Sequence, residues 1–148
     1  MNKNLLLSIL LAGIFTGCST TPVSVNNSQS VPQDRTYQAF TKYSKPDASL
    51  SNIVITRDNG ILGAAGTAAL FANGEIVARV KAGESITLHL KPGDNILGIG
   101  PGSKLNWEKD NTELIEQTLN AEASKTYYFR ITIDRTKGLI LQRTSQTQ

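Results

Sequence analysis

Cysteine and histidine are nearly absent from this 148-residue chain, which holds one of each, Cys18 and His89. A single cysteine excludes a disulfide within the chain, a CxxC redox pair and a cysteine-based zinc site. A single histidine supplies one imidazole, whereas zinc sites need three or four protein ligands. The acidic residues show no calcium-binding spacing. We therefore expect no metal and no other cofactor.

The sequence also lacks recognisable catalytic or phosphate-binding motifs. Alternation along Glu84–Leu90 places His89 on the polar face of a strand, and the sequence fixes no serine or acid beside it. The glycine-rich run from Gly98 to Lys104 lacks the spacing and the following helix of a phosphate-binding loop. We therefore expect that this protein is not an enzyme.

Charge of one sign and long apolar runs are also missing. The chain has 15 lysines and arginines against 12 acidic residues, and the basic residues are scattered along it among the acids. Without a basic stripe, nucleic acid is not an expected partner. The run from Leu5 to Phe15 is much shorter than the roughly 20 apolar residues of a membrane-spanning helix. An uncleaved transmembrane anchor is therefore not predicted.

What the sequence does have is a three-part start. Lys3 gives a basic beginning, Leu5 to Phe15 is apolar, and Thr16-Gly17-Cys18 is a small-residue cleavage site. This layout is typical of a secretory signal over residues 1–17. Because it ends on cysteine, it resembles the lipobox of bacterial lipoproteins, which implies cleavage between Gly17 and Cys18 and acylation of Cys18. A plain secretory signal followed by a chance cysteine is the alternative.

The residues after the cysteine predict location and attachment. In Gram-negative lipoproteins, aspartate in the place of Ser19 favours the inner membrane, so the resemblance implies the outer membrane, on its periplasmic face. The membrane is then a partner through the lipid of Cys18. From Ser19 to Asp34 the chain is mostly Ser, Thr, Asn, Gln and Pro. Such a composition buries too little apolar surface to become ordered, so residues 18–34 are predicted to form a flexible tether.

The rest of the chain is predicted to form one all-β domain. Residues 52–143 alternate short β-branched or aromatic runs with turn signals such as Asn73-Gly74, which indicates a small antiparallel β-sandwich of about seven strands. Residues 113–120 fit a strand or a helix, and the strand is preferred because a turn and another β-rich run follow. Residues 35–51 are expected to pack on this domain, and residues 144–148 are a polar tail.

Part of this domain is similar to known envelope proteins. Between Ile53 and Arg130 the runs IVITR, FANGEIVARV, AGESITLHLKPGDNIL and KTYYFRI resemble a family of bacterial envelope lipoproteins classed only as a domain of unknown function. The same order of strands and turns is similar to PEGA-type and carboxypeptidase-regulatory-like sandwich modules. The resemblance implies a membrane-anchored accessory or binding domain with an envelope protein as partner, and it brings no catalytic residues.

Four residues are candidates for a binding surface. Trp107 and Lys104 lie in the long segment between Gly98 and Asp110, and loops on rigid sandwiches often carry function. Tyr37 and Phe40 have the spacing of aromatic side chains that either pack on the domain or stack on a sugar or peptide. A glycan, peptidoglycan or an inhibited lytic enzyme is therefore the alternative to an accessory partner.

Overall fold

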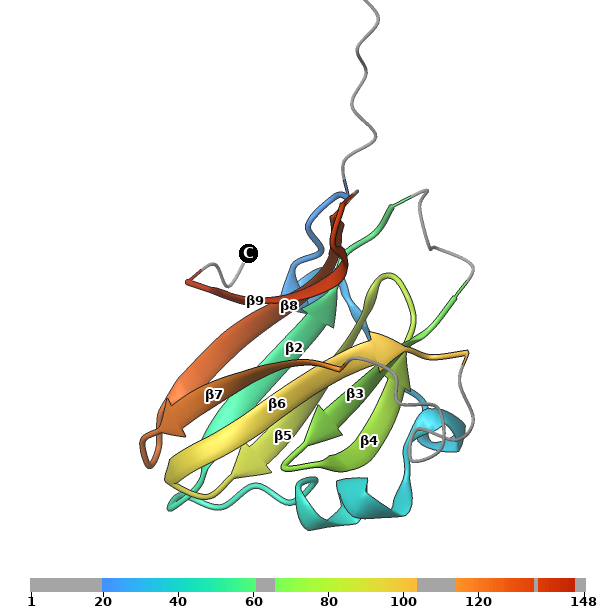
Figure 1. Ribbon diagram of the computed structural model, residues 1–148. Coiled ribbons are helices and arrows are strands. Elements are labelled where there is room, and N and C mark those ends of the chain that lie inside the picture. Colours follow the sequence, from blue (N-terminus) through green and yellow to red (C-terminus); the bar gives the residue numbers. More distant parts are fainter. Residues whose placement is uncertain (1–19, 61–65, 104–113, 135, 146–148) are drawn as a thin grey trace, which may run out of the picture.

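The computed structural model describes residues 20–60, 66–103, 114–134 and 136–145, and it shows two β-sheets packed face to face (Figure 1). This described part contains nine strands, three short 3-10 helices and no α-helix. The strands are β1 (Gln29–Ser30), β2 (Ser51–Arg57), β3 (Ala68–Ala72), β4 (Glu75–Val80), β5 (Glu84–Leu90), β6 (Gly93–Pro101), β7 (Ile115–Ala121), β8 (Thr126–Asp134) and β9 (Gly138–Thr144). The 3-10 helices are η1 (Val25–Asn27), η2 (Gln33–Arg35) and η3 (Gln38–Lys42). The all-β sandwich predicted from the sequence is confirmed.

The two sheets have five and four strands. The five-stranded sheet has the order β1-β5-β2-β8-β9, and the four-stranded sheet has the order β4-β3-β6-β7. Most neighbours are antiparallel, but β2 runs parallel to β8 and β1 runs parallel to β5. The chain changes sheets after β2, β4, β5 and β7. These crossings tie the layers together at both ends of the sandwich.

The two ends of the sandwich carry different turns, as the strand directions require. At one end lie residues 58–60 after β2, residues 81–83 between β4 and β5, and the turn between β8 and β9. We call this the Asp58 end. At the other end lie Asn73-Gly74 between β3 and β4, residues 91–92 between β5 and β6, and the turn between β7 and β8. We call this the Asn73 end.

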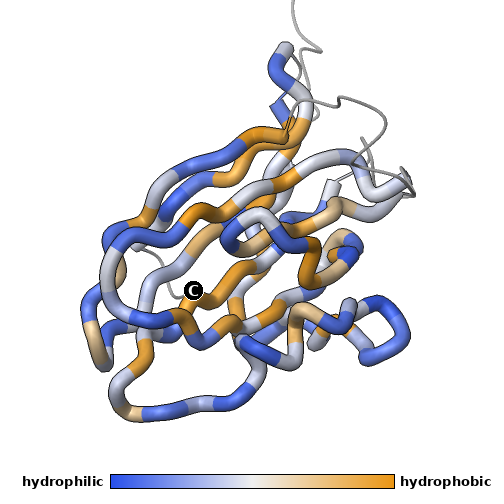
Figure 2. The backbone as a smooth tube through the Cα atoms, turned by 60° about the horizontal axis from the view of Figure 1, so that its bottom comes forward, coloured by the Kyte–Doolittle hydropathy of each residue, from blue (hydrophilic) through white to orange (hydrophobic). Residues whose placement is uncertain are grey.

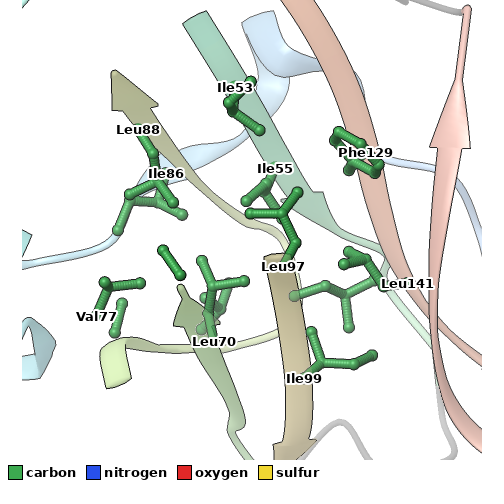
Figure 3. Packing of buried hydrophobic residues seen from close by; sticks show 14 of the residues in the cluster. Ile53, Ile55, Leu70, Val77, Ile86, Leu88, Leu97, Ile99, Phe129 and Leu141 are labelled. Carbon is green, nitrogen blue, oxygen red and sulfur yellow. The ribbon is translucent and has the colours of Figure 1, made fainter. Parts of the chain in front are cut away.

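The core fills the space between the sheets. Apolar residues lie along the strands and polar residues along the turns (Figure 2). Large side chains from facing strands meet in the middle, and those that are fully buried include Ile53, Ile55, Leu70, Leu88, Leu97 and Ile99 (Figure 3). Each such burial stabilises the fold by about 1.5–3 kcal/mol relative to exposure. Without a disulfide, this cluster is the main source of stability.

Strand β4 departs from simple alternation. Strict alternation would place Val77 and Ala78 on opposite faces, yet both are fully buried in the core cluster together with Val80. The pairing of β3 with β4 shifts register between Leu70 and Phe71, as at a β-bulge. An extra residue in one strand bends it and rotates the neighbouring side chains. The bulge therefore brings two consecutive residues of β4 to the core.

The N-terminal segment differs from the flexible tether that its composition predicts. Its strand β1 pairs with the edge strand β5. The amide of Gln29 donates to the carbonyl of Gly83 at 3.0 Å, and the amide of Val31 donates to that of Ser85 at 3.0 Å. Main-chain pairing at a sheet edge orders these polar residues. The prediction from composition considers only the apolar surface that they can bury, so it leaves out these hydrogen bonds. The prediction is thus corrected for residues 20–34, the described part of the tether.

The segment after it covers the edge of the four-stranded sheet. The amide of Tyr37 donates to the carbonyl of Val77 in β4 at 3.0 Å, and Phe40 and Tyr43 pack against the core cluster. Asp34 lies inside η2. Together with β1, this segment covers the edge of each sheet on one side of the sandwich, as edge strands require.

The strands near the C-terminus decide one strand assignment and one boundary. Ile115–Ala121 forms β7, so the strand interpretation of residues 113–120 is confirmed for its described part. The alternation there leaves Leu119 and Ala121 buried. Thr144, predicted to begin the polar tail, is instead the last residue of β9, because its main chain continues the pairing with β8.

Candidate functional site

Of the four predicted binding residues, the structure describes two, Tyr37 and Phe40. Trp107 and Lys104 lie outside the described residues, as do Gly17 and Cys18. Tyr37 is half-buried, and the guanidinium carbon of Arg79 lies 5.7 Å from its ring centroid. Phe40 packs against the core. These two aromatic residues therefore hold the N-terminal segment on β4, and the predicted stacking surface stays a prediction.

A hollow of about 470 Å³ lies at the Asn73 end. It opens between the segment that follows η3 and the short crossover from β5 to β6. Its lining combines polar, apolar and aromatic side chains, and consists of Lys42, Tyr43, Leu50, Asn73, His89, Lys91, Pro92, Asp94 and Asn95. We call it the Asn73 hollow. Concave sites with a few fixed polar groups are the usual form of ligand pockets.

Two asparagines fix one wall of the Asn73 hollow. Asn73 adopts a left-handed backbone with φ of 49°, as the hairpin turn requires. Its side-chain oxygen accepts from the amide of Ile96 at 2.9 Å, and its nitrogen donates to Asn95 at 3.1 Å. Asn95 in turn donates to the carbonyls of Lys91 and Gly93 at 2.9 and 3.0 Å. These amides are therefore held in place before any ligand arrives.

His89 contributes a polar atom to the hollow. Its Nδ1 lies 2.8 Å from the side-chain oxygen of Asn52, and its amide donates to the carbonyl of Tyr43 at 2.8 Å. An amide oxygen only accepts, so this contact assigns the proton to Nδ1 and leaves Nε2 as an acceptor. Within the described chain Nε2 has no hydrogen-bond partner. The neighbouring Lys91 is exposed and offers a cation.

The polar groups of the Asn73 hollow are suited to binding a polar ligand. Imidazole, ammonium and amide groups there match the hydroxyls and carboxylates of a polar ligand such as a glycan. No serine, threonine or cysteine lines it. Among the described residues, no group of three or more His, Cys, Asp and Glu side chains is placed to hold a metal.

A second polar cluster lies at the Asp58 end. The side chain of Asp58 is fully buried and accepts two hydrogen bonds from Arg130, at 3.0 Å from Nε and 2.5 Å from Nη2. Arg57, also buried, donates from Nη1 to the carbonyls of Val80 and Gly66 at 2.6 and 2.9 Å. Burial lowers the pKa of Arg57, and the charge of Glu84 partly offsets this. These contacts tie the end of β2 to β4 and β8.

Glu84 completes this cluster at the start of β5. Both of its oxygens accept from the guanidinium of Arg35, and one also accepts from the amide of Lys81 at 2.7 Å. Burial raises the pKa of Glu84, but these hydrogen bonds and the two positive charges outweigh burial, so the pKa is lowered overall. The carboxylate therefore joins the N-terminal segment to the sheet in its charged form.

The pH dependence of folding follows from the lowered pKa of Glu84. The unfolded chain binds a proton near the ordinary value of 4.5, while the folded chain binds it only at lower pH. The contribution of Glu84 to stability is thus complete above 4.5 and is lost as the pH falls through the folded pKa. In urea unfolding at several pH values, Glu84→Gln is expected to lower the free energy of unfolding at pH 7. It is also expected to make that free energy fall less steeply as the pH drops below 4.5. Glu75→Gln, which removes an exposed carboxylate, is the control. This account would be contradicted if the free energy of unfolding of Glu84→Gln fell with decreasing pH as steeply as that of the unchanged protein.

Comparison with known protein families and with curated proteins finds no match for this chain. Within the described residues, no helix has the length and apolar character needed to cross a membrane. Any role proposed for the protein therefore rests on the predicted N-terminal signal, on the attachment of residues 20–21 to the domain, and on the two polar clusters.

Proposed function

We propose that this protein is a lipoprotein of the bacterial outer membrane, and that its sandwich faces the periplasm as a non-catalytic binding domain for another envelope component. The observation that carries the proposal is the pairing of Thr21 with Asn59, only three residues after the lipobox-like cysteine. Cleavage before Cys18 would leave every described contact of the fold intact, because those contacts begin at Thr20.

The lipid anchor is tested by Cys18→Ala in cells fed labelled palmitate. The unchanged protein is expected to carry the label and to sediment with the outer membrane, because Cys18 is the sole thiol available for acylation. The variant is expected to lose the label. Ser19→Asp is the matched control, expected to keep the label but to remain in the inner membrane. Equal labelling of Cys18→Ala would refute the anchor.

The partner is sought by crosslinking in cells and mass spectrometry of what co-purifies. One dominant envelope protein, recovered with the acylated form and lost with Cys18→Ala, would establish the accessory role. The absence of disulfide bonds does not weaken this role, since the apolar cluster holds the domain together without one.

A second candidate function is the binding of glycan or peptidoglycan. The Asn73 hollow favours it, because Tyr43 is an aromatic residue on its wall and His89 and Lys91 offer an acceptor and a cation beside the fixed amides. Aromatic side chains with a polar tip are suited to sugar recognition. Recovery of peptidoglycan fragments in place of a protein in the crosslinking experiment would favour this candidate.

A further inference from the structure

The N-terminal segment is fastened to the Asp58 end of the sandwich. Thr21 and Asn59 exchange two main-chain hydrogen bonds, at 2.6 Å from the Thr21 amide and 3.0 Å from the Asn59 amide. The hydroxyls of Thr20 and Thr132 lie 2.6 Å apart. A Cβ on Gly60 would lie 3.0 Å from the methyl of Thr20 and 3.3 Å from its Cα, so glycine permits this close approach.

This attachment limits how far the domain can stand from its anchor. Cys18 precedes Thr20 by two residues, and two residues extend the chain by at most about 7 Å. A coil over the whole of residues 18–34 would instead have spanned about 20 Å. Since residues 20–34 lie on the domain, they add no such distance. An acylated Cys18 would therefore hold the Asp58 end directly at the headgroups.

The charges at the Asp58 end suit a lipid surface. The acids in the described part of this end make contacts within the protein. Asp58 binds Arg130, and Glu84 binds Arg35. Asp134 accepts from the amides of Thr136 and Lys137 at 2.8 and 2.9 Å. Lys81 and Lys137 are both exposed, and neither forms an ion pair within the described chain. Two exposed ammonium groups on the turns of one end are attracted to anionic lipid phosphates.

We propose that the Asp58 end rests on the phospholipid headgroups and that the Asn73 hollow points away from the membrane. This orientation rests on the proposed lipid anchor of Cys18. Because β2 spans Ser51–Arg57 and a strand rises about 3.3 Å per residue, the hollow lies about 20 Å farther along the sandwich. Figure 1 shows the chain at residue 20, in blue, at the end where the β2 arrow points, and the β3–β4 turn at the opposite end.

The orientation is tested with the full acylated protein in vesicles of phosphatidylethanolamine and phosphatidylglycerol that carry a headgroup quencher. A fluorophore is attached at Lys137→Cys at the Asp58 end, or at Lys91→Cys at the Asn73 end. The two changes are matched, since each replaces one exposed lysine in a turn. Quenching is expected to be several-fold stronger at position 137. Equal quenching, or stronger quenching at position 91, would overturn the orientation.

Failure of the anchor is told apart from failure of the orientation by palmitate incorporation and vesicle flotation of the same samples. Acylated protein that floats with the vesicles but is quenched equally at both positions refutes the orientation alone. Protein that carries no palmitate refutes the anchor, and with it the orientation that rests on it. Circular dichroism of both labelled variants checks that the sandwich is intact.

Discussion

Leu97→Ala is expected to destabilise the domain by about 2–5 kcal/mol. Leu97 lies on β6, is fully buried, and belongs to the same apolar cluster as Ile55 of β2 and Leu141 of β9 (Figure 3). Truncation removes contacts with the facing sheet and leaves a cavity that neighbouring strands cannot fill without shifting. Small domains are stable by only about 5–15 kcal/mol, so this loss is a large part of the total.

The measurement is urea unfolding followed by circular dichroism, with Ile96→Ala as the matched control. Ile96 is the adjacent residue of β6 and points outward, with 44% of its surface exposed. Its truncation is expected to change the free energy of unfolding by no more than about 0.5 kcal/mol. Similar losses in the two variants would mean that β6 does not separate a buried face from an exposed one.

Asp58→Asn is expected to cost about 3–5 kcal/mol, the usual effect of removing one partner from a buried ion pair. The Asp58 side chain is fully buried and the Arg130 side chain is 21% exposed, so the remaining guanidinium cannot recover full hydration. The amide that replaces the carboxylate also turns an NH2 group toward one of the arginine donors. The end of β2 would then lose the ion pair that joins it to β8.

A double-mutant cycle with Arg130→Gln measures the coupling. Removing both charges is expected to cost less than the sum of the single changes, because no unpaired ion is left inside. Asp94→Asn is the control, since Asp94 is exposed and, within the described residues, accepts a hydrogen bond from Asn120 alone, at 2.8 Å. Additive losses in the cycle would show that Asp58 and Arg130 do not stabilise each other.

Much of the fold could be predicted from local signals. Alternation along β5 correctly places Ile86, Leu88 and Leu90 inside, and Asn73-Gly74 correctly marks a hairpin. These signals are strong because a strand alternates with period two and because few residues tolerate positive φ. The order of strands could not be predicted this way, since local patterns do not say which distant strands pair.

The order in the N-terminal segment and the Asn73 hollow could not be predicted from the sequence, for related reasons. Composition measures the apolar surface that Gln29 and Ser30 can bury, but it does not measure the hydrogen bonds that an open edge of β5 offers them. Alternation along β5 predicts that His89 lies on the polar face of its strand. Its contact with Asn52 could not be predicted, because it depends on the pairing of β2 with β5. Tyr43 carries a weak signal only, as the third aromatic residue in a three-residue spacing.

The parallel pairing of β2 with β8 has a kinetic consequence. Asn52 lies opposite Thr126 in this pair, 74 residues farther along the chain. Closing so long a loop is slow, because its entropy is lost before the contacts form. The five-stranded sheet therefore cannot be completed until β8 and β9 have been synthesised. Most of the chain is therefore made while β2 still lacks its parallel neighbour.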